Sequence, residues 1–379
     1  MPTVLPFRPG DPAPWFKAAS SNNPGFAFDT VAGRYIVLCF FPSSAAPPAA
    51  AALEAVARHR ELFDDEKLCF FGVTSDPRDR DEGRCRQMLP GVRYFWDTDL
   101  AIAKAYGAVD ADAAPGATPL NYHAHWLVLD PMLRVIGMIP LDEQGRHATA
   151  VIEFLRRLPD VDGHARIPMW APVLVLPRVF EPDFCQRLIA YYGEQGGEDG
   201  GFMRDVDGQT VGIVDHSHKR RSDCLVEDEE LKRAARVRIE RRLVPEVRKC
   251  FQFGTTRMER YLVGCYAAET GGHFKAHRDN TTFGTAHRRF AVTINLDAES
   301  YEGGDLGFPE FGTRRYRAPT GGCVVFSCSL LHQVWPVTKG KRYAFLPFLY
   351  DDAAARQRER NNSRLAESVG AYRSEVTAP

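Results

Sequence analysis

The sequence predicts a two-domain protein: an α/β domain followed by an antiparallel barrel or double-sheet jelly roll with flanking helices. The chain has 379 residues, more than one ordinary hydrophobic core organises. Residues 10–160 alternate apolar strands with amphipathic helices, whereas short strands separated by turn residues begin near residue 257. Between these regions, residues 159–172 contain proline and glycine without periodicity, which is typical of an exposed linker.

The first region contains a predicted βαβ unit. Residues 35–41 (YIVLCFF) and 67–75 (KLCFFGVTS) are continuous apolar runs, as expected of strands covered on both faces. The segment 49–63 between them has helical spacing. Two strand-like runs follow within 125–140, and a predicted helix at 148–158 closes the region.

The second region begins with helices and continues with strands. Helices are expected at 181–195 and 228–251, on either side of a Gly-rich, charged loop near 196–222. The short strands that follow favour a barrel or jelly roll. We therefore divide the chain into a first domain (1–160), a linker (161–171), a second domain (172–352) and a polar C-terminal tail (353–379).

Composition restricts the functional classes. With 48 basic and 49 acidic residues, the formal charge of −1 gives no global reason to expect nucleic acid or an anionic membrane as a partner. The first residues lack the pattern of a signal peptide, and eighteen uncharged apolar residues never run together. Nine cysteines without a CxxC pair fit reduced thiols. We expect a cytoplasmic protein.

A candidate metal site begins in the stretch GGHFKAHRD (271–279). His277 and Asp279 are two positions apart, so on a strand their side chains point to the same face. The pair fits half of a metal site, but it also fits a hydrogen-bonded pair or a solvated edge. His332, in SLLHQVWPV, is the candidate third ligand, with a satisfied core histidine as the alternative. Together the three would form the facial triad of a non-haem Fe(II) oxygenase.

Arg342 suggests a cosubstrate for such a site. It opens the strand RYAFLPFLY just after the turn TKGK, and a hairpin there would bring its guanidinium near the site. A guanidinium is a planar fork suited to a carboxylate. A dicarboxylate that chelates iron at one end and pairs with Arg342 at the other would explain this charge. Otherwise Arg342 is solvated on an outer face.

Residues 172–352 resemble a 2-oxoglutarate- and Fe(II)-dependent dioxygenase of the prolyl-4-hydroxylase-like group. The resemblance lies in CYAAETGGHFKAHRDN, RRFAVTINLD, YEGGDLGFPEFG and GGCVVFSCSLLHQVWPVTKGKRYAFLPF, in that order. It implies a double-stranded β-helix, with iron on His277, Asp279 and His332. It also implies that Arg342 binds 2-oxoglutarate and that Tyr266 helps to hold it.

The same resemblance implies a reaction. An amino acid, a peptide, a protein or another small molecule would be hydroxylated with O2, releasing succinate and CO2. Related halogenases lack the carboxylate that Asp279 supplies here, so hydroxylation is the expected outcome. Two alternatives remain open: desaturation or cyclisation of a natural-product precursor, and a sensor that binds iron and 2-oxoglutarate without turnover.

Residues 1–160 resemble a peroxiredoxin of the AhpC/TSA family, through GDPAPWF, VLCFFPSS, FFGVTSD and HWLVLDPMLRVIG. The resemblance implies a thioredoxin-like fold. Counted from Pro42, the family's Thr/Ser and peroxidatic Cys positions hold Ala46 and Ala49, and its arginine position falls near Ala124. Alanine has no sulfur, so we expect a pseudo-peroxiredoxin. Three roles remain open for this domain: it could pair into a homodimer, dock a substrate protein, or serve as a passive folding partner.

Other polar residues around the candidate site allow two interpretations. His216, His218 and the run KRRSD (219–223) fall in the Gly-rich loop and fit either a mobile basic lid or ordinary solvated charge. His273 lies at an even offset from His277, so it fits either a contact to substrate or an exposed strand entry.

Overall fold

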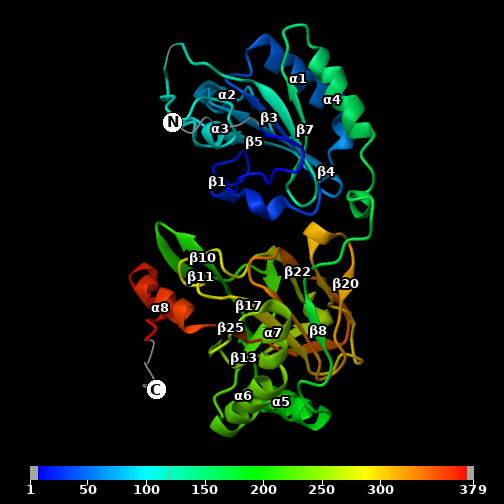
Figure 1. The fold of residues 1–379 in the computed structure, drawn as a ribbon, viewed down its shortest axis with the longest axis vertical. Coiled ribbons are helices and arrows are strands. Elements are labelled where there is room, and N and C mark those ends of the chain that lie inside the picture. The colour runs from blue at the N-terminus through cyan, green and yellow to red at the C-terminus, as the bar shows by residue number, and fades with distance from the viewer. Residues whose placement is uncertain (1–6, 118, 374–379) are drawn as a thin grey trace. The chain divides into compact units, whose positions relative to one another are not determined.

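The computed structural model describes residues 7–117 and 119–373 (Figure 1). The chain divides into two compact units. The first runs to Trp170 and includes Pro309–Thr313, and the second comprises Ala171–Phe308 and the residues from Arg314 onward. Within the described ranges, no helix has both the length and the apolar character needed to cross a membrane.

The first unit is built on a sheet with the strand order β5-β4-β3-β6-β7, as far as the described residues show (Figure 1). β3, β4 and β5 are parallel, and β6 and β7 are antiparallel to their neighbours. β3, α1 and β4 thus form a parallel βαβ unit. The elements are β1 (Lys17–Ala18), β2 (Phe26–Ala27), β3 (Tyr35–Phe41), α1 (Pro47–Arg58), β4 (Leu68–Thr74), α2 (Pro77–Asp81), β5 (Val92–Trp96), α3 (Ala101–Ala105), β6 (His125–Leu129), β7 (Val135–Pro140) and α4 (Arg146–Arg156).

Both central strands of this sheet are buried along their whole length. On one face, Val37 and Cys39 pack with residues of α1 and α4 such as Val56 and Val151. On the other, Phe71 stacks on Phe95 at 5.1 Å within a group of aromatic rings. This two-sided cover is why the strands are continuous apolar runs in the sequence.

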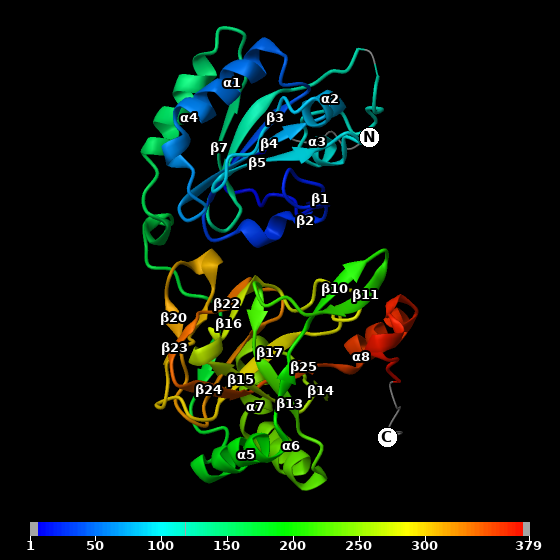
Figure 2. The same cartoon turned by 180° about the vertical axis from the view of Figure 1, so that it is seen from behind.

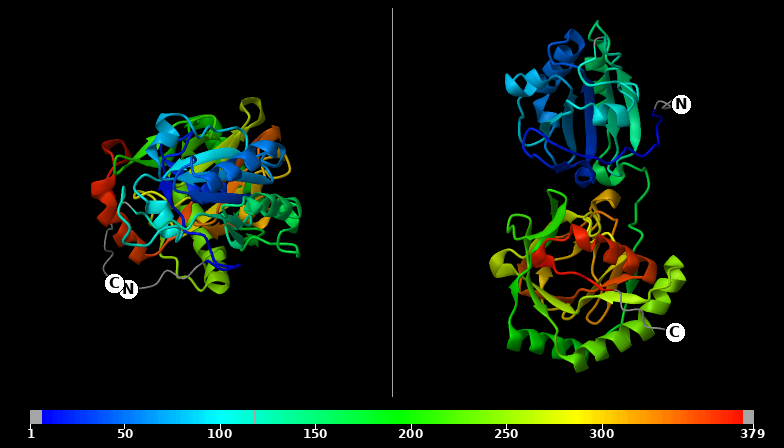
Figure 3. Two further views of the ribbon diagram at one scale, coloured as in Figure 1. Left: turned by 90° about the horizontal axis from the view of Figure 1, so that it is seen from above. Right: turned by 90° about the vertical axis from the view of Figure 1, so that its left-hand side faces the viewer.

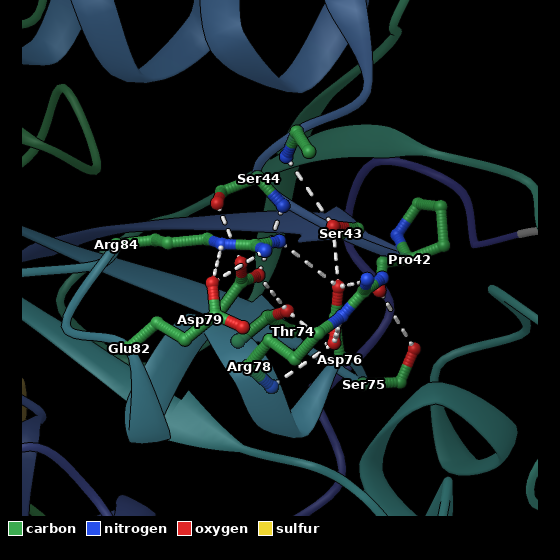
Figure 4. Close-up of polar contacts among 11 residues, drawn as sticks. Pro42, Ser43, Ser44, Thr74, Ser75, Asp76, Arg78, Asp79, Glu82 and Arg84 are labelled. Atoms are coloured by element: carbon green, nitrogen blue, oxygen red, sulfur yellow. Dashed lines mark hydrogen bonds and ion pairs between the residues drawn. The ribbon is translucent and has the colours of Figure 1, made fainter.

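The loop between β3 and α1 is tied to the β4–α2 segment by two aspartates (Figure 4). Asp79, which is fully buried, accepts hydrogen bonds from the backbone N–H of Ser44 at 2.9 Å and from the hydroxyls of Ser44 and Thr74, both at 2.5 Å. Asp76 accepts one from the Ser43 hydroxyl at 2.7 Å. Neutral donors therefore satisfy the Asp79 carboxylate and fix the loop.

The second unit contains two larger antiparallel sheets in the described residues (Figure 2). One has the order β14-β25-β17-β24-β15-β13-β9, with β21 on β17 and β8 on β21, and the other has the order β12-β16-β22-β19-β20. The strands of the first are β8 (Leu174–Leu176), β9 (Glu198–Asp199), β13 (Ser222–Leu225), β14 (Arg257–Glu259), β15 (Leu262–Ala267), β17 (Phe290–Asn295), β21 (Cys323–Ser327), β24 (Lys341–Phe345) and β25 (Phe348–Tyr350). Those of the second are β12 (Lys219–Arg220), β16 (His273–His277), β19 (Leu306–Gly307), β20 (Arg315–Tyr316) and β22 (His332–Val334).

Helices cover one face of the larger sheet. Val263 and Phe345 of its strands form one apolar cluster with Phe184, Leu188 and Ile239 of the helices, which lie under the strands in the right-hand view of Figure 3. Because side chains alternate along a strand, the opposite face is free for other residues. The helices are α5 (Pro182–Gln195), α6 (Glu229–Arg242) and α7 (Val244–Phe251), with α8 (Asp352–Arg360) near the end of the described chain.

Two predicted elements differ in the structure. The single helix expected over 228–251 is two, because Pro245 lies in the first turn of α7, where a helix begins readily but cannot continue from a preceding one. The expected loop near 196–222 contains an antiparallel hairpin of β10 (Phe202–Val206) and β11 (Gln209–Ile213). Another short pair joins β18 (Glu302–Gly303) to β23 (Val337–Lys339).

Candidate active site

The structure brings His277, Asp279 and His332 together. His277 ends β16 and is paired in register with His332 at the start of β22. Asp279 follows β16, and its backbone N–H donates to the carbonyl of Cys328 at 2.9 Å. The Nε2 atoms of His277 and His332 lie 3.6 and 3.3 Å from the two carboxylate oxygens of Asp279. One nitrogen or oxygen from each residue lies within 4.8 Å of the others, a spacing that could hold a metal ion.

The protonation of the two imidazoles also suits a metal. His277 Nδ1 lies 2.7 Å from the carbonyl of Lys275, and His332 Nδ1 lies 3.0 Å from that of Leu330. A carbonyl only accepts, so Nδ1 carries a proton in each ring, which leaves Nε2 as the atom available to a metal. Burial, followed by the nearby His277, lowers the pKa of His332 to about 4, so His332 is neutral at pH 7.

Tyr266 and Arg342 form a second group, on the larger sheet. They are register partners on β15 and β24, both are only 2% exposed, and the guanidinium carbon of Arg342 lies 5.1 Å from the Tyr266 ring centre. Arg342 Nη2 donates to the hydroxyl of Thr293 on β17 at 3.0 Å. Both side chains lie on the face opposite the helices, so the solvated position considered for Arg342 is wrong.

The Arg342 guanidinium forms no ion pair within the part of the chain that the structure describes. Among the described residues, its Nε and Nη1 atoms are buried and have no hydrogen-bond partner. An unpaired cation inside a protein is costly, and free guanidinium N–H donors are suited to carboxylate oxygens. The donors of Arg342 and the two-nitrogen, one-oxygen ligand set therefore fit a carboxylate ligand and an Fe(II) ion, respectively.

A chain of buried ionic contacts, which the sequence did not indicate, leads from Tyr266 to the hairpin. Arg221 is 8% exposed, pairs with Asp223 through two N–H groups, and donates to the Tyr266 hydroxyl at 3.4 Å. Lys219 is 3% exposed, lies 3.5 Å from the Asp223 carboxylate and donates to the carbonyl of Gly201, just before β10, at 2.7 Å. Solvated charge is thus the wrong interpretation for Lys219 and Arg221, which are buried, whereas Arg220 is exposed. Lys219, Arg221 and Asp223 are alternate residues, so on a strand their side chains share one face. This spacing is the signal that could have indicated their contacts.

Replacing Asp223 should destabilise the protein strongly. In Asp223→Asn, Arg221 keeps its buried charge without a counterion, which we expect to cost about 3 kcal/mol of unfolding free energy. Urea unfolding measures the difference. The control Glu302→Gln removes an exposed partner of Lys339 and should cost less than about 1 kcal/mol. Equal losses in the two variants would contradict a buried ion pair at Asp223.

The Lys219 ammonium should make stability depend on pH. Burial, followed by Arg221, lowers the pKa of Lys219 to about 6, whereas an unfolded chain has a lysine pKa of about 10.4. Between these values the unfolded state binds the extra proton, so stability should increase with pH, by at most about 1.4 kcal/mol per unit. Urea unfolding of wild type and Lys219→Met from pH 6 to 9 should show this slope in wild type alone. The exposed-lysine variant Lys249→Met should keep the slope, and a slope retained by Lys219→Met would contradict the assignment.

The other histidines of this region lie at the margin of the triad. His273 Nδ1 donates to the carbonyl of Gly271 at 2.7 Å, and His216 lies 3.5 Å from Asp199. His218 packs against Phe202, and its ring centre lies 6.3 Å from that of His277. Of these three, His218 comes nearest to the candidate metal ligands.

Comparison with known proteins assigns a family to each unit. Residues 261–350 match the model of the 2OG-Fe(II) oxygenase superfamily, and residues 9–132 match that of the AhpC/TSA family. The chain thus joins a 2OG-Fe(II) oxygenase domain to an AhpC/TSA domain of thioredoxin-like fold. Alanine occupies positions 46 and 49, where that family's Thr/Ser and reactive cysteine are expected.

Individual proteins are similar to parts of the chain. A PKHD-type hydroxylase of Pseudomonas fluorescens is 41% identical over 91 residues, which are 22% of this chain and 39% of the relative. The chain thus spans about two fifths of the curated relatives it matches. A prolyl hydroxylase from Trichoplax adhaerens, solved with a hypoxia-inducible-factor peptide, is 14% identical and covers 49% of this chain and 86% of its own, with a TM-score of 0.39. A bacterioferritin comigratory protein from Xanthomonas campestris is 18% identical and covers 37% of this chain and 90% of its own, with a TM-score of 0.30.

Proposed function

We propose that this protein is an Fe(II)- and 2-oxoglutarate-dependent dioxygenase that hydroxylates an amino acid, a peptide or a protein. The observation that carries the proposal is the pairing of two sites. His277, Asp279 and His332 present two lone pairs and a carboxylate to one point, and Arg342 presents an unpaired buried cation. One ligand set suits Fe(II) and the other suits a carboxylate.

The residues of the two groups would have separate roles. His277, Asp279 and His332 would hold the iron, and Arg342, Thr293 and Tyr266 would orient the distal carboxylate of 2-oxoglutarate. Fe(II) with 2-oxoglutarate and O2 supplies a reaction in which one oxygen atom enters succinate, the other enters the substrate C–H bond, and CO2 leaves. Orientation of the cosubstrate at a buried arginine keeps water from competing for its carboxylate.

The architecture we propose follows from the same residues. The two larger sheets of the second unit would be the halves of a double-stranded β-helix, since each contributes one of the two groups. β16 and β22 carry the metal ligands, and β15 and β24 carry Tyr266 and Arg342. We place this domain at 172–352, after a first domain at 1–160 and a linker at 161–171. The name of the hydroxylase relatives supports hydroxylation rather than desaturation or cyclisation.

The test is anaerobic reconstitution with Fe(II) and 2-oxoglutarate, then admission of O2 and quantification of succinate. Wild type should form succinate slowly when no substrate is present. It should form succinate faster when the true substrate is among the amino acids or peptides that are added. Asp279→Ala and Arg342→Ala should form none. Binding of both ligands without succinate would instead support a sensor, and binding of neither would overturn the proposal.

We further propose that the AhpC/TSA domain has no peroxidase activity. Ala49 is buried in the first turn of α1, where the reactive sulfur would be needed. Burial raises the pKa of the Cys39 and Cys69 thiols, and burial with Asp79 raises that of Cys85 to about 12, so none of the three supplies a thiolate at pH 7. Metal-free protein with dithiothreitol should consume hydrogen peroxide no faster than its Cys85→Ser variant. Faster consumption by wild type would contradict this.

A further inference from the structure

A second cavity, of about 310 Å³, lies on the helix side of the larger sheet. Ser222, Cys265 and Tyr343 are register partners on β13, β15 and β24, and all three line it. Their chain neighbours Tyr266 and Arg342 point to the other face of the same strands. Tyr192 of α5 forms a wall, and its ring centre lies 5.2 Å from that of Tyr343. These lining residues are therefore on the opposite face of the sheet from the candidate 2-oxoglutarate site, whereas Arg221, which also lines the cavity, contacts the Tyr266 hydroxyl.

The uncharged polar groups of this cavity are hydrogen-bond donors. Burial raises the pKa of both the Tyr192 and the Tyr343 phenol, so each keeps its proton at pH 7. Ser222 and Thr270 contribute hydroxyl groups. Hydroxyl groups can donate to an anionic ligand without a change in their own charge.

The charged groups of the cavity are mostly cationic. Arg220, Arg221 and Lys341 line it. Arg221 pairs with Asp223, whereas no ion pair or hydrogen bond of the Arg220 or Lys341 side chain is found in residues 7–117 and 119–373. The carboxylate that lines it belongs to Asp199, whose partner His216 lies 3.5 Å away. Two cations without counterions therefore face a wall of hydroxyl donors, an arrangement that attracts a small oxyanion.

We propose that this cavity binds a small oxyanion, a carboxylate or a phosphate, at a site distinct from that of 2-oxoglutarate. The guanidinium of Arg220 and the ammonium of Lys341 supply the charge. The Tyr192, Ser222 and Tyr343 hydroxyls supply directional hydrogen bonds. Arg221 also lines the cavity and contacts the Tyr266 hydroxyl, but the side chains that would bind the anion, those of Arg220 and Lys341, form no hydrogen bond or ion pair with Tyr266 or Arg342 in the described structure. The site therefore does not depend on the proposed oxygenase activity.

Isothermal titration calorimetry of the metal-free full-length protein tests the proposal, with inorganic phosphate and succinate as separate probes at millimolar concentrations. At least one probe should bind wild type, and Arg220→Gln/Lys341→Gln should weaken that binding roughly tenfold or more. Binding of phosphate alone or of succinate alone identifies the source of the oxyanion.

Two controls separate this site from other anion contacts. Lys339→Gln removes an exposed lysine of β23 that pairs with Glu302, and it should bind the probe as wild type does. Arg342→Ala removes the cation of the opposite face and should leave the affinity for phosphate unchanged. The proposal is overturned if neither probe binds wild type, if the double variant binds normally, or if Arg342→Ala alone abolishes binding. Thermal melts of each variant confirm that it is folded.

Discussion

Asp279→Ala should lose Fe(II) binding and, with it, succinate formation. Asp279 is the only carboxylate of the triad, and its oxygens lie between the two histidine Nε2 atoms at 3.6 and 3.3 Å. Changes in residues that merely support metal ligands weaken metal binding about 10- to 100-fold, so removing the ligand itself should exceed roughly 100-fold. Equilibrium dialysis against Fe(II) under anaerobic conditions measures the affinity directly.

A matched control is Asp183→Ala, which removes an exposed carboxylate in the first turn of α5. It should bind Fe(II) in the same ratio as wild type and form succinate at the same rate. If Asp279→Ala keeps stoichiometric Fe(II), the metal is held elsewhere and the triad is not the metal site.

Arg342→Met should give two opposite effects. Loss of the buried cation should weaken 2-oxoglutarate binding by about 2–5 kcal/mol, or roughly 30-fold and more, because the carboxylate loses a desolvated charged partner. The ligand-free protein should instead become more stable, since Met replaces a buried guanidinium whose Nε and Nη1 are unpaired in the described structure. Calorimetric titration of 2-oxoglutarate and thermal unfolding of the ligand-free protein measure the two quantities.

Measuring both the 2-oxoglutarate affinity and the stability of the ligand-free protein distinguishes a binding residue from a structural one. A purely structural Arg342 would lower stability when it is replaced, and 2-oxoglutarate affinity would change only as far as the fold does. The exposed control Arg356→Met, on α8, should change neither quantity. A ligand-free Arg342→Met protein that is less stable than wild type would contradict the account.

The local part of the metal site could be predicted because it depends on strand geometry. His277 and Asp279 are two residues apart, and the alternation of a strand places them on one side. His332 could be proposed as a ligand only from its apolar neighbours. It is paired with His277 through the register of β16 and β22, and the two residues are 55 positions apart in the sequence. The sequence does not encode that register in any local pattern.

The supporting residues could not be predicted for a related reason. Thr293 contacts Arg342 through a strand pairing that spans 49 residues. Arg221 and Asp223 lie in a charged run, and charged runs are usually solvated, so composition pointed away from a buried pair. The β10–β11 hairpin was expected as a loop because its glycines and charged residues hide the alternation that marks a strand.

The most direct test of the central claim is anomalous diffraction at the iron edge from crystals loaded anaerobically with Fe(II) and 2-oxoglutarate. We expect one strong anomalous peak at coordination distance from Nε2 of His277, Nε2 of His332 and a carboxylate oxygen of Asp279. The distal carboxylate of 2-oxoglutarate should accept hydrogen bonds from the Arg342 guanidinium. An iron peak away from these three residues, or a cosubstrate carboxylate that leaves Arg342 unpaired, would contradict the central claim.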